Sequence, residues 1–349
     1  MERTDRLGVT SFLMNDSAGH RPTINPTMSP LITYEQFLTF LMYISPLTIA
    51  ICTVGIFSNI INIVVFYKMG LTSSANTSLF SLAIADACNV SAVLVMSFEN
   101  MFDDSQLPMK MSDITLLTSH AYYFFSAMCS WITTIISMER TCCIIFPMKV
   151  KQIFTQKTIL SLIAGMLIYQ TCTGLPKSFA TGLSRTISPL TNRTLIFFDF
   201  SKLDAFMFKT SMLISLSIPN LICFTIVLVG TVFFIINFKQ SRKLRNSMSG
   251  SGGISDKTSD KDARLIRLVI CICIIYIVGA APNVGVYLAE TIYPPLHVSN
   301  PHLGYFIHAC YIVCNLFQAT ASSVNIFVYF GMGSKFMQTF KEIFLNKAN

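Results

Sequence analysis

Seven long apolar stretches run along this chain, and they constrain its fold more than any other feature of the sequence. They cover about residues 44–67, 79–101, 115–138, 158–176, 206–238, 264–289 and 303–330. A helix needs about 20 predominantly apolar residues to cross a bilayer core of roughly 30 Å. The stretches are continuous rather than alternating, which argues against the strands of a membrane barrel. The sequence therefore predicts an all-α membrane protein, folded as a bundle of seven transmembrane helices.

Charged residues are scarce and unevenly placed. They make up 12% of the chain, against roughly 25% in a typical soluble domain, so the lipid bilayer must be the solvent for much of the surface. Lys and Arg residues concentrate in segments 68–78, 139–157 and 239–263 and in the C-terminal tail. Because basic loops stay in the cytoplasm, we expect the N-terminus outside. The net charge of +8 then reflects topology, and no nucleic-acid partner is expected.

Three parts are expected along the chain. They are an extracellular N-terminal segment (1–40), a seven-transmembrane domain (41–332) and a short cytoplasmic amphipathic helix with the tail (333–349). Residues 1–36 contain no apolar core of a cleaved signal peptide. We therefore expect the first transmembrane helix to serve as its own insertion signal.

Two segments on the cytoplasmic side have a distinctive composition. Residues 247–262 are rich in Gly, Ser and charge, which predicts a flexible loop. The tail places four apolar side chains on one helical face, namely Phe336, Phe340, Ile343 and Phe344. Such a face suits a helix that lies along the inner membrane surface.

Glu139 and Arg140 form a charged pair at the inner end of the third stretch. A charge at the bilayer centre costs roughly 3 kcal/mol or more, so charges next to an apolar segment need a reason. An acid and a base side by side neutralise one another and can still be separated by movement. The pair suits a conformational switch and points to a signalling receptor rather than an enzyme. Asp86, deep in the second stretch, similarly needs a partner, water or an ion.

A series of short motifs occurs in a fixed order on the expected helices. They are GIFSN at 55–59, SLAIAD at 81–86, ERT at 139–141, Pro147, Pro219, Pro282 and NIFVY at 325–329. Taken together, they resemble the rhodopsin-like (class A) family of G-protein-coupled receptors over residues 44–345. In detail the chain resembles orphan peptide-type and chemosensory receptors of invertebrates such as molluscs. The resemblance implies a plasma-membrane receptor that converts binding of an extracellular ligand into activation of a heterotrimeric G protein.

The resemblance also assigns roles to individual residues. The switch and G-protein coupling would involve Glu139, Arg140, Pro147, Asp262, Asn325 and Tyr329. Asp262 lies 20 residues before Pro282, about 30 Å along a helix, which places it level with Arg140 as a second partner. The alternative is a solvated loop charge. A polar network able to hold sodium would join Asn59, Asp86 and Asn325; the alternative is a protonated Asp86 satisfied by its neighbours.

Several family features are missing. Thr115 stands where the family has the helix cysteine of its outer disulfide, and the loop 177–205 contains no cysteine, so no disulfide is expected. Ala280 replaces the bulky tryptophan of the sixth helix, and Ile326 replaces a proline of the seventh. We expect Tyr276 to take over the packing role of the missing tryptophan.

These differences also narrow the ligand. Tyr122 stands where amine receptors carry an acid, and Ala319 where retinal pigments carry a lysine, so a peptide or chemosensory cue is favoured. The expected pocket comprises Glu99, Tyr122, Tyr123, Tyr276, Ala280 and Glu290. An acidic rim surrounds it, formed by Glu99, Asp103, Asp104, Asp199, Asp204 and Glu290. Such a rim would attract a basic peptide or a small cation, unless these acids serve only solubility at the interface.

Other functions remain as alternatives. A transporter or channel would favour several intramembrane charges along a path and internal repeats, whereas the chain has essentially one deep charge and no repeat. The altered motifs also allow a seven-helix protein that binds ligand without signalling. No nucleophile–base pair argues for an enzyme, and neither a cofactor nor a metal site is expected. Asn15 and Asn192 lie in expected outer segments as glycosylation sequons.

Overall fold

The computed structural model describes residues 29–101, 111–145, 150–179, 182–187, 194–199, 205–248, 256–293, 295–296, 300–332 and 334–345. Its elements follow one another as α2 (Tyr34–Met69), α3 (Ser74–Glu99), α4 (Met111–Ile145), α5 (Val150–Ile153), α6 (Gln156–Phe179), β1 (Gly182–Ile187), β2 (Thr194–Asp199), α7 (Ala205–Met212), the π-helix η4 (Leu213–Ser217), α8 (Ile218–Met248), α9 (Asp256–Ile292), α10 (Gly304–Met332) and α11 (Ser334–Phe344). Among the described residues, seven helical spans are long and apolar enough to cross a membrane.

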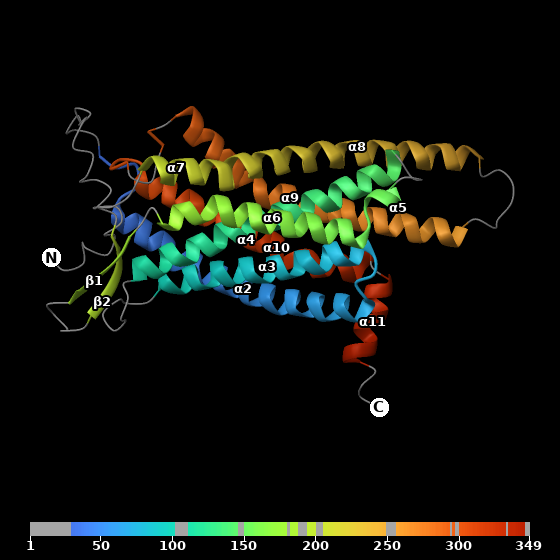
Figure 1. Ribbon diagram of the computed structural model, residues 1–349, viewed down its shortest axis with the longest axis horizontal. Helices are drawn as coiled ribbons and strands as arrows, with labels where there is room; N and C mark the ends of the chain where they lie inside the picture. The colour runs from blue at the N-terminus through green and yellow to red at the C-terminus, as the bar shows by residue number, and fades with distance from the viewer. Residues whose placement is uncertain are drawn as a thin grey trace.

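The membrane-crossing helices lie side by side as one bundle (Figure 1). Helix α4 packs against α3, α6, α8 and α9, and α10 packs against α2, α3 and α9. The strands lie at the same end of the bundle as the start of α2, here called the outer end, whereas α5 and α11 lie at the opposite, inner end, where α11 turns away from the bundle axis. The predicted seven-helix bundle with a short C-terminal helix is confirmed.

Several helices are longer than the apolar stretches that predicted them. Helix α2 begins at Tyr34, where Thr33 and Gln36 form a capping box: the Thr33 amide donates to Gln36 Oε1 over 2.9 Å, and the Gln36 amide donates to Thr33 Oγ1 over 3.3 Å. Helix α9 begins at Asp256, so residues 256–262 are helical and the prediction of a flexible loop over them was wrong. Hydropathy marks only the part of a helix that lipid surrounds, and polar residues can continue the same helix into water.

A two-stranded antiparallel sheet lies within the segment 177–205, which the sequence analysis treated only as a loop. Strands β1 and β2 pair in register from Gly182 opposite Asp199 to Ile187 opposite Thr194. A hairpin satisfies the backbone of each strand with that of its neighbour. The pair therefore gives this outer segment regular structure in a chain whose eleven cysteines are all free thiols.

The fifth membrane span contains a π-helical turn, η4, directly before Pro219. Proline has no N–H, so Pro219 cannot donate to the carbonyl of Ser215 four residues earlier. Gln170 of α6 instead donates its side-chain amide to that carbonyl over 3.0 Å, and Tyr169 donates its hydroxyl to the carbonyl of Ile214 over 2.8 Å. Because no water reaches these groups in lipid, α6 supplies the hydrogen bonds that the irregular helix needs.

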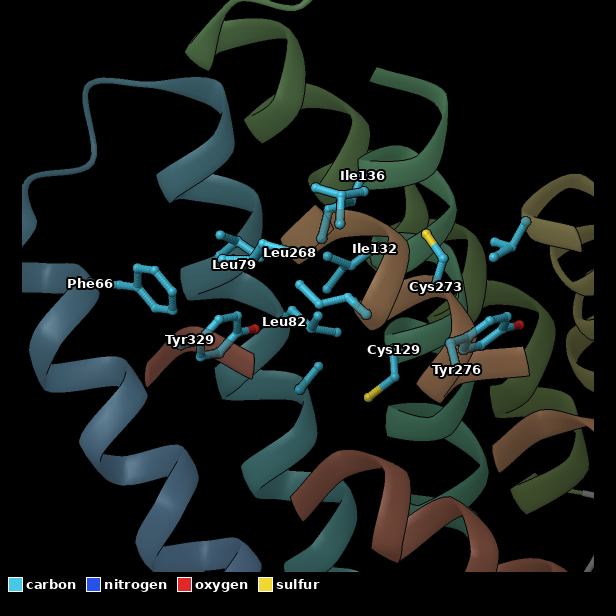
Figure 2. Close-up of a cluster of buried hydrophobic side chains, with 14 of the residues drawn as sticks. Phe66, Leu79, Leu82, Cys129, Ile132, Ile136, Leu268, Cys273, Tyr276 and Tyr329 are labelled. Carbon is cyan, nitrogen blue, oxygen red and sulfur yellow. The ribbon is translucent and has the colours of Figure 1, made fainter. Parts of the chain in front are cut away.

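The main apolar core joins side chains of α2, α3, α4, α8, α9, α10 and α11 (Figure 2). Phe66 and Tyr329 meet edge-on, with ring centroids 5.1 Å apart, and the labelled leucine and isoleucine side chains of α3, α4 and α9 gather beside them. Tyr276 is 6% exposed and belongs to this cluster; that it takes over the packing role of the missing tryptophan stays a prediction. Outward-facing apolar side chains remain exposed, for example Phe57 at 65%, because lipid covers them.

Helices α2 and α10 approach closely at Gly55. A Cβ atom added at this position would overlap the Ser323 side chain of α10. The Ser58 hydroxyl of α2 donates to the Ser323 carbonyl over 3.1 Å, so the contact cannot open without loss of a buried hydrogen bond. A small residue is therefore required on α2 at this crossing.

We predict that Gly55→Ala lowers the stability of the folded receptor by about 1–3 kcal/mol, the usual cost of overpacking a well-packed site. Thermal unfolding in detergent, followed with a thiol-reactive dye, measures the effect. Gly165→Ala is the matched control, because the space around Gly165 in α6 is open. Equal melting temperatures for the two variants would contradict the close approach.

Candidate functional site

Glu139 and Arg140 lie near the inner end of α4, where the sequence predicted a switch. Glu139 is 5% exposed, and its Oε1 atom lies 3.9 Å from Arg140 Nη2. The same oxygen accepts a hydrogen bond of 2.7 Å from the Ser74 hydroxyl, at the first turn of α3. The acid is therefore tied both to its neighbour in the chain and to a second helix. Ser74 was not anticipated, since a serine has no sequence signal for a partner on another helix.

The charged pair is incompletely satisfied. Among the described residues, neither Glu139 Oε2 nor Arg140 Nε has a hydrogen-bond partner. A small cavity of about 10 Å³ borders Arg140 and is lined by Gly230 and Phe234 of α8 and by Val269 of α9, among others. Arg140 thus lies where α4, α8 and α9 converge. Buried charges without full pairing are costly, so a modest change in contacts can favour another arrangement.

A buried polar network crosses the middle of the bundle. Asn325 of α10 donates its side-chain amide to Asp86 Oδ2 over 2.9 Å, and the Cys129 thiol of α4 donates to Asp86 Oδ1 over 3.3 Å. Asp86 is 3% exposed, so these contacts replace water. Asn59 joins indirectly, because its amide donates to the Ser322 carbonyl over 2.9 Å while Ser322 lines a narrow cavity with Asp86. The structure brings the three predicted network residues together, with Ser322 as an unforeseen link.

Tyr329 lies four residues beyond Asn325 and connects the network to the C-terminal helix. It is 1% exposed and packs against Phe336 of α11 with a centroid distance of 5.4 Å. Phe340 packs in turn on Phe330, 4.8 Å between centroids. Phe336 and Phe340 thus dock against the bundle, whereas Phe344 on the same predicted face remains 45% exposed. Aromatic packing therefore joins the inner end of α10 to α11.

The expected ligand pocket is nearly filled by its own side chains. Tyr122 is 3% exposed and lies 5.4 Å from Tyr123 between ring centroids. Tyr276 and Ala280 line a void of about 10 Å³, together with Ser126, Ser130, Asn220, Asn283, Val284, Tyr287 and Gln318. The structure therefore brings together aromatic and uncharged polar side chains of α4, α8, α9 and α10, in a closed arrangement.

Two acids of the expected pocket lie at the outer ends of their helices. Glu99 closes α3, is 7% exposed and accepts a hydrogen bond of 3.1 Å from the Thr118 hydroxyl. Glu290 lies near the end of α9, and its Oε2 atom accepts a hydrogen bond of 2.8 Å from the Tyr311 hydroxyl. Tyr311 was missed because the sequence places it a whole outer loop away from Glu290.

A larger cavity of about 720 Å³ lies elsewhere, between the outer halves of α2, α9 and α10. Phe37, Phe40 and Phe306 are among its mostly apolar lining residues. The segment before α2 is held beside it by a hydrogen bond of 3.0 Å from the Leu31 amide to the His302 carbonyl. Nothing in the sequence pattern indicated this cavity.

Some predicted residues fall outside the described part of the chain. They are Pro147, the sequons at Asn15 and Asn192, and the rim acids Asp103, Asp104 and Asp204. The backbones of Asp199 and Asp262 lie in β2 and α9, whereas their side chains are not described. Among the described residues, no group of three His, Cys, Asp or Glu side chains is arranged to hold a metal ion.

Comparison with family models matches residues 46–347 to the family described as serpentine type 7TM GPCR chemoreceptor Srw. No curated protein matches the chain. The family match spans all seven membrane-crossing helices and α11.

We predict that the Asp86–Asn325 hydrogen bond stabilises the receptor and that the Asp and the Asn can be swapped between the two positions. Asn325→Asp removes the amide that donates to Asp86 and should destabilise the receptor by roughly 1–3 kcal/mol. The double variant Asp86→Asn/Asn325→Asp restores a donor opposite an acceptor and should recover at least half of that loss. A double-mutant cycle of detergent melting temperatures measures the coupling; strictly additive effects would show that the two side chains do not interact.

Proposed function

Because the chain belongs to the Srw family of serpentine seven-transmembrane G-protein-coupled chemoreceptors, we propose that the Ser74–Glu139–Arg140 contact is the inner lock of its signalling switch. The protein is a multi-pass membrane receptor that couples an extracellular chemosensory ligand to a G protein. Its family is typically non-enzymatic. The lock would hold the inactive state, and ligand binding would favour a state in which Arg140 is released toward the G protein.

The single observation that carries this proposal is the hydrogen bond between the Ser74 hydroxyl and Glu139 Oε1. It joins α3 to α4 at the inner end of the bundle, beside the Glu139–Arg140 ion pair. A hydrogen bond to a charged group typically contributes about 1.5–3 kcal/mol. That magnitude is enough to bias a two-state equilibrium by roughly tenfold or more, which is what a reversible lock requires.

A set of contacts leads from the expected pocket toward the inner end of the bundle. Tyr276 lines the void of the expected pocket and also the cavity that contains Asp86. Asp86 bonds Asn325, and Tyr329 on the same helix reaches the inner core. We propose that rearrangement of α9 and α10 around these contacts transmits ligand binding inward, in place of the missing tryptophan and proline.

The finer identity of the receptor is also a proposal. The ordered motifs, from GIFSN at 55–59 to NIFVY at 325–329, support a rhodopsin-like relationship and likeness to mollusc-type orphan receptors. The concentration of Lys and Arg in segments 68–78, 139–157 and 239–263 supports a plasma-membrane receptor with its N-terminus outside. Tyr122, in place of an amine-binding acid, supports a peptide ligand or another chemosensory cue.

We predict that Glu139→Gln and Ser74→Ala both raise ligand-independent G-protein activation, by roughly three- to tenfold, because each weakens the lock of the inactive state. The combined variant should signal little more than the stronger single variant, since both act on one contact. Energy-transfer sensors of G-protein dissociation, in cells matched for surface expression, measure the change. Ser91→Ala is the control, because that hydroxyl donates only to the Ala87 carbonyl of its own helix.

Arg140→Ala separates signalling from mere ligand binding. Loss of the guanidinium should abolish G-protein activation by an active tissue extract while surface expression stays unchanged. If Arg140→Ala signals as wild type does, or if Glu139→Gln leaves the baseline of a ligand-responsive receptor unaltered, the proposed lock is wrong.

We propose Asp262 as the second partner of Arg140, on the basis of its position in α9, 20 residues before Pro282. Asp262→Ala should then raise basal G-protein activation about twofold or more. Asp260→Ala is a matched control, because it removes the same charge from the same turn and residues two apart face different sides of a helix. Equal baselines for the two variants would show that Asp262 is only a cytoplasmic surface charge.

A further inference from the structure

The Glu290 carboxylate is an unneutralised charge at the outer end of the bundle. It is half-buried on α9, and the Tyr311 hydroxyl of α10 donates to its Oε2 atom over 2.8 Å. No ion pair joins it to any residue whose side chain is described. A partly buried carboxylate at a membrane boundary calls for a positive partner, and a single neutral hydrogen bond does not supply one.

Tyrosine rings from three helices lie near this carboxylate. Tyr311 and Tyr287 have centroids 6.3 Å apart and an interplanar angle of 48°, whereas Tyr122 and Tyr123 are 5.4 Å apart at 59°. Tyr123 lies close enough to interact with Glu290, and Tyr287 with both tyrosines of α4. Both pairs are tilted rather than stacked, and tyrosine faces attract cations.

By sequence, the expected outer segments and helix ends carry 9 Lys and Arg against 11 Asp and Glu residues. Glu35, Glu99 and Glu290 are acids whose side chains are described at this end. So small an excess of acids does not select a cation, and the preference for one rests on the local contacts of Glu290.

An unpaired polar group lies below the tyrosines. Tyr287 also lines the narrow void that contains Asn283, Gln318 and Tyr276. The Tyr276 hydroxyl is buried and has no hydrogen-bond partner among the described residues. At about 10 Å³ the void has room for no more than a water molecule, so it marks the inner limit of the proposed site.

We propose that Glu290 and Tyr123, Tyr287 and Tyr311 form a recognition site for a cationic head group, an ammonium or a guanidinium. Glu290 is the counter-ion, the tyrosine faces hold the cation, and the Tyr311 hydroxyl positions the carboxylate. The proposal rests on the proposed receptor function only in that it takes this end of the bundle as the ligand side. It assigns the ligand class that the receptor recognises, whichever residues form the inner lock.

Pairs of charged and neutral isosteres test the site directly. The full-length receptor, purified in a maltoside detergent that carries no choline group, is melted with choline and with its neutral isostere 3,3-dimethylbutanol at equal concentration. A thiol-reactive dye reports unfolding, because ten of the eleven cysteines are buried or half-buried. Near saturation we expect choline to raise the melting temperature by about 2–5 °C more than the neutral isostere does.

Two further cations identify the head group. Butylammonium and the arginine derivative N-acetyl-arginine amide are compared with butanol and N-acetyl-glutamine amide. A larger shift from the arginine derivative indicates the guanidinium of a basic peptide, whereas a larger shift from choline or butylammonium indicates a small ammonium ligand. Both results support the site; equal shifts from charged and neutral members of every pair overturn it.

Variants tie the effect to named side chains. Glu290→Gln should abolish the difference between charged and neutral probes, and Tyr311→Phe should weaken cation affinity severalfold while it keeps the ring. Glu35→Gln is the matched control, because it removes the same charge from the exposed first turn of α2 on the same side of the membrane. If Glu290→Gln and Glu35→Gln behave alike, the carboxylate acts only through long-range charge and the site is refuted.

This test is independent of signalling. Probe binding to the purified receptor requires no G protein, so a failed inner lock would leave the melting shifts unchanged. Conversely, loss of the cation preference would leave the basal signalling of the Glu139 and Ser74 variants unchanged. The two proposals can therefore fail separately.

Discussion

The structure depends on one constraint: in lipid, every backbone N–H and C=O must find a partner within the protein. That requirement makes the seven spans helical, and it explains how a described span can depart from a regular α-helix at η4. At η4, directly before Pro219, Gln170 and Tyr169 donate hydrogen bonds to backbone carbonyls from a neighbouring helix. The same scarcity of water makes each buried polar side chain costly unless another side chain satisfies it.

Polar contacts therefore mark the positions where the bundle can change state. Asp86 is held by Asn325 and Cys129 in the middle, whereas Glu139 at the inner end accepts a side-chain hydrogen bond from Ser74 and Glu290 at the outer end accepts one from Tyr311. The middle network holds the helices together. Glu139 and Glu290 have fewer hydrogen bonds, and they are the carboxylates at which we propose that a G protein and a ligand act. Both the fold and the proposed signalling contacts thus depend on how buried polar groups are hydrogen-bonded.

The sequence predicted some of this arrangement well and some of it poorly, for physical reasons. The transmembrane spans were found because hydropathy is a local property, but the start of α9 at Asp256 was missed because its first turns are polar. Strands β1 and β2 were missed because their pairing joins segments that no short apolar pattern distinguishes from a loop. The Asp86–Asn325 contact was anticipated from motif order alone, whereas Ser74 and Tyr311 carry no motif.

The sequence by itself determined that the chain crosses a membrane seven times, which end carries the basic residues, and which acids and bases need a partner. These properties belong to individual residues and their neighbours along the chain. Only the tertiary structure decided which partner each charge receives, because a helix rotated by one residue presents a different face to its neighbours. Packing placed Ser74 against Glu139 and Tyr311 against Glu290, the two contacts on which the proposed lock and the proposed cation site rest.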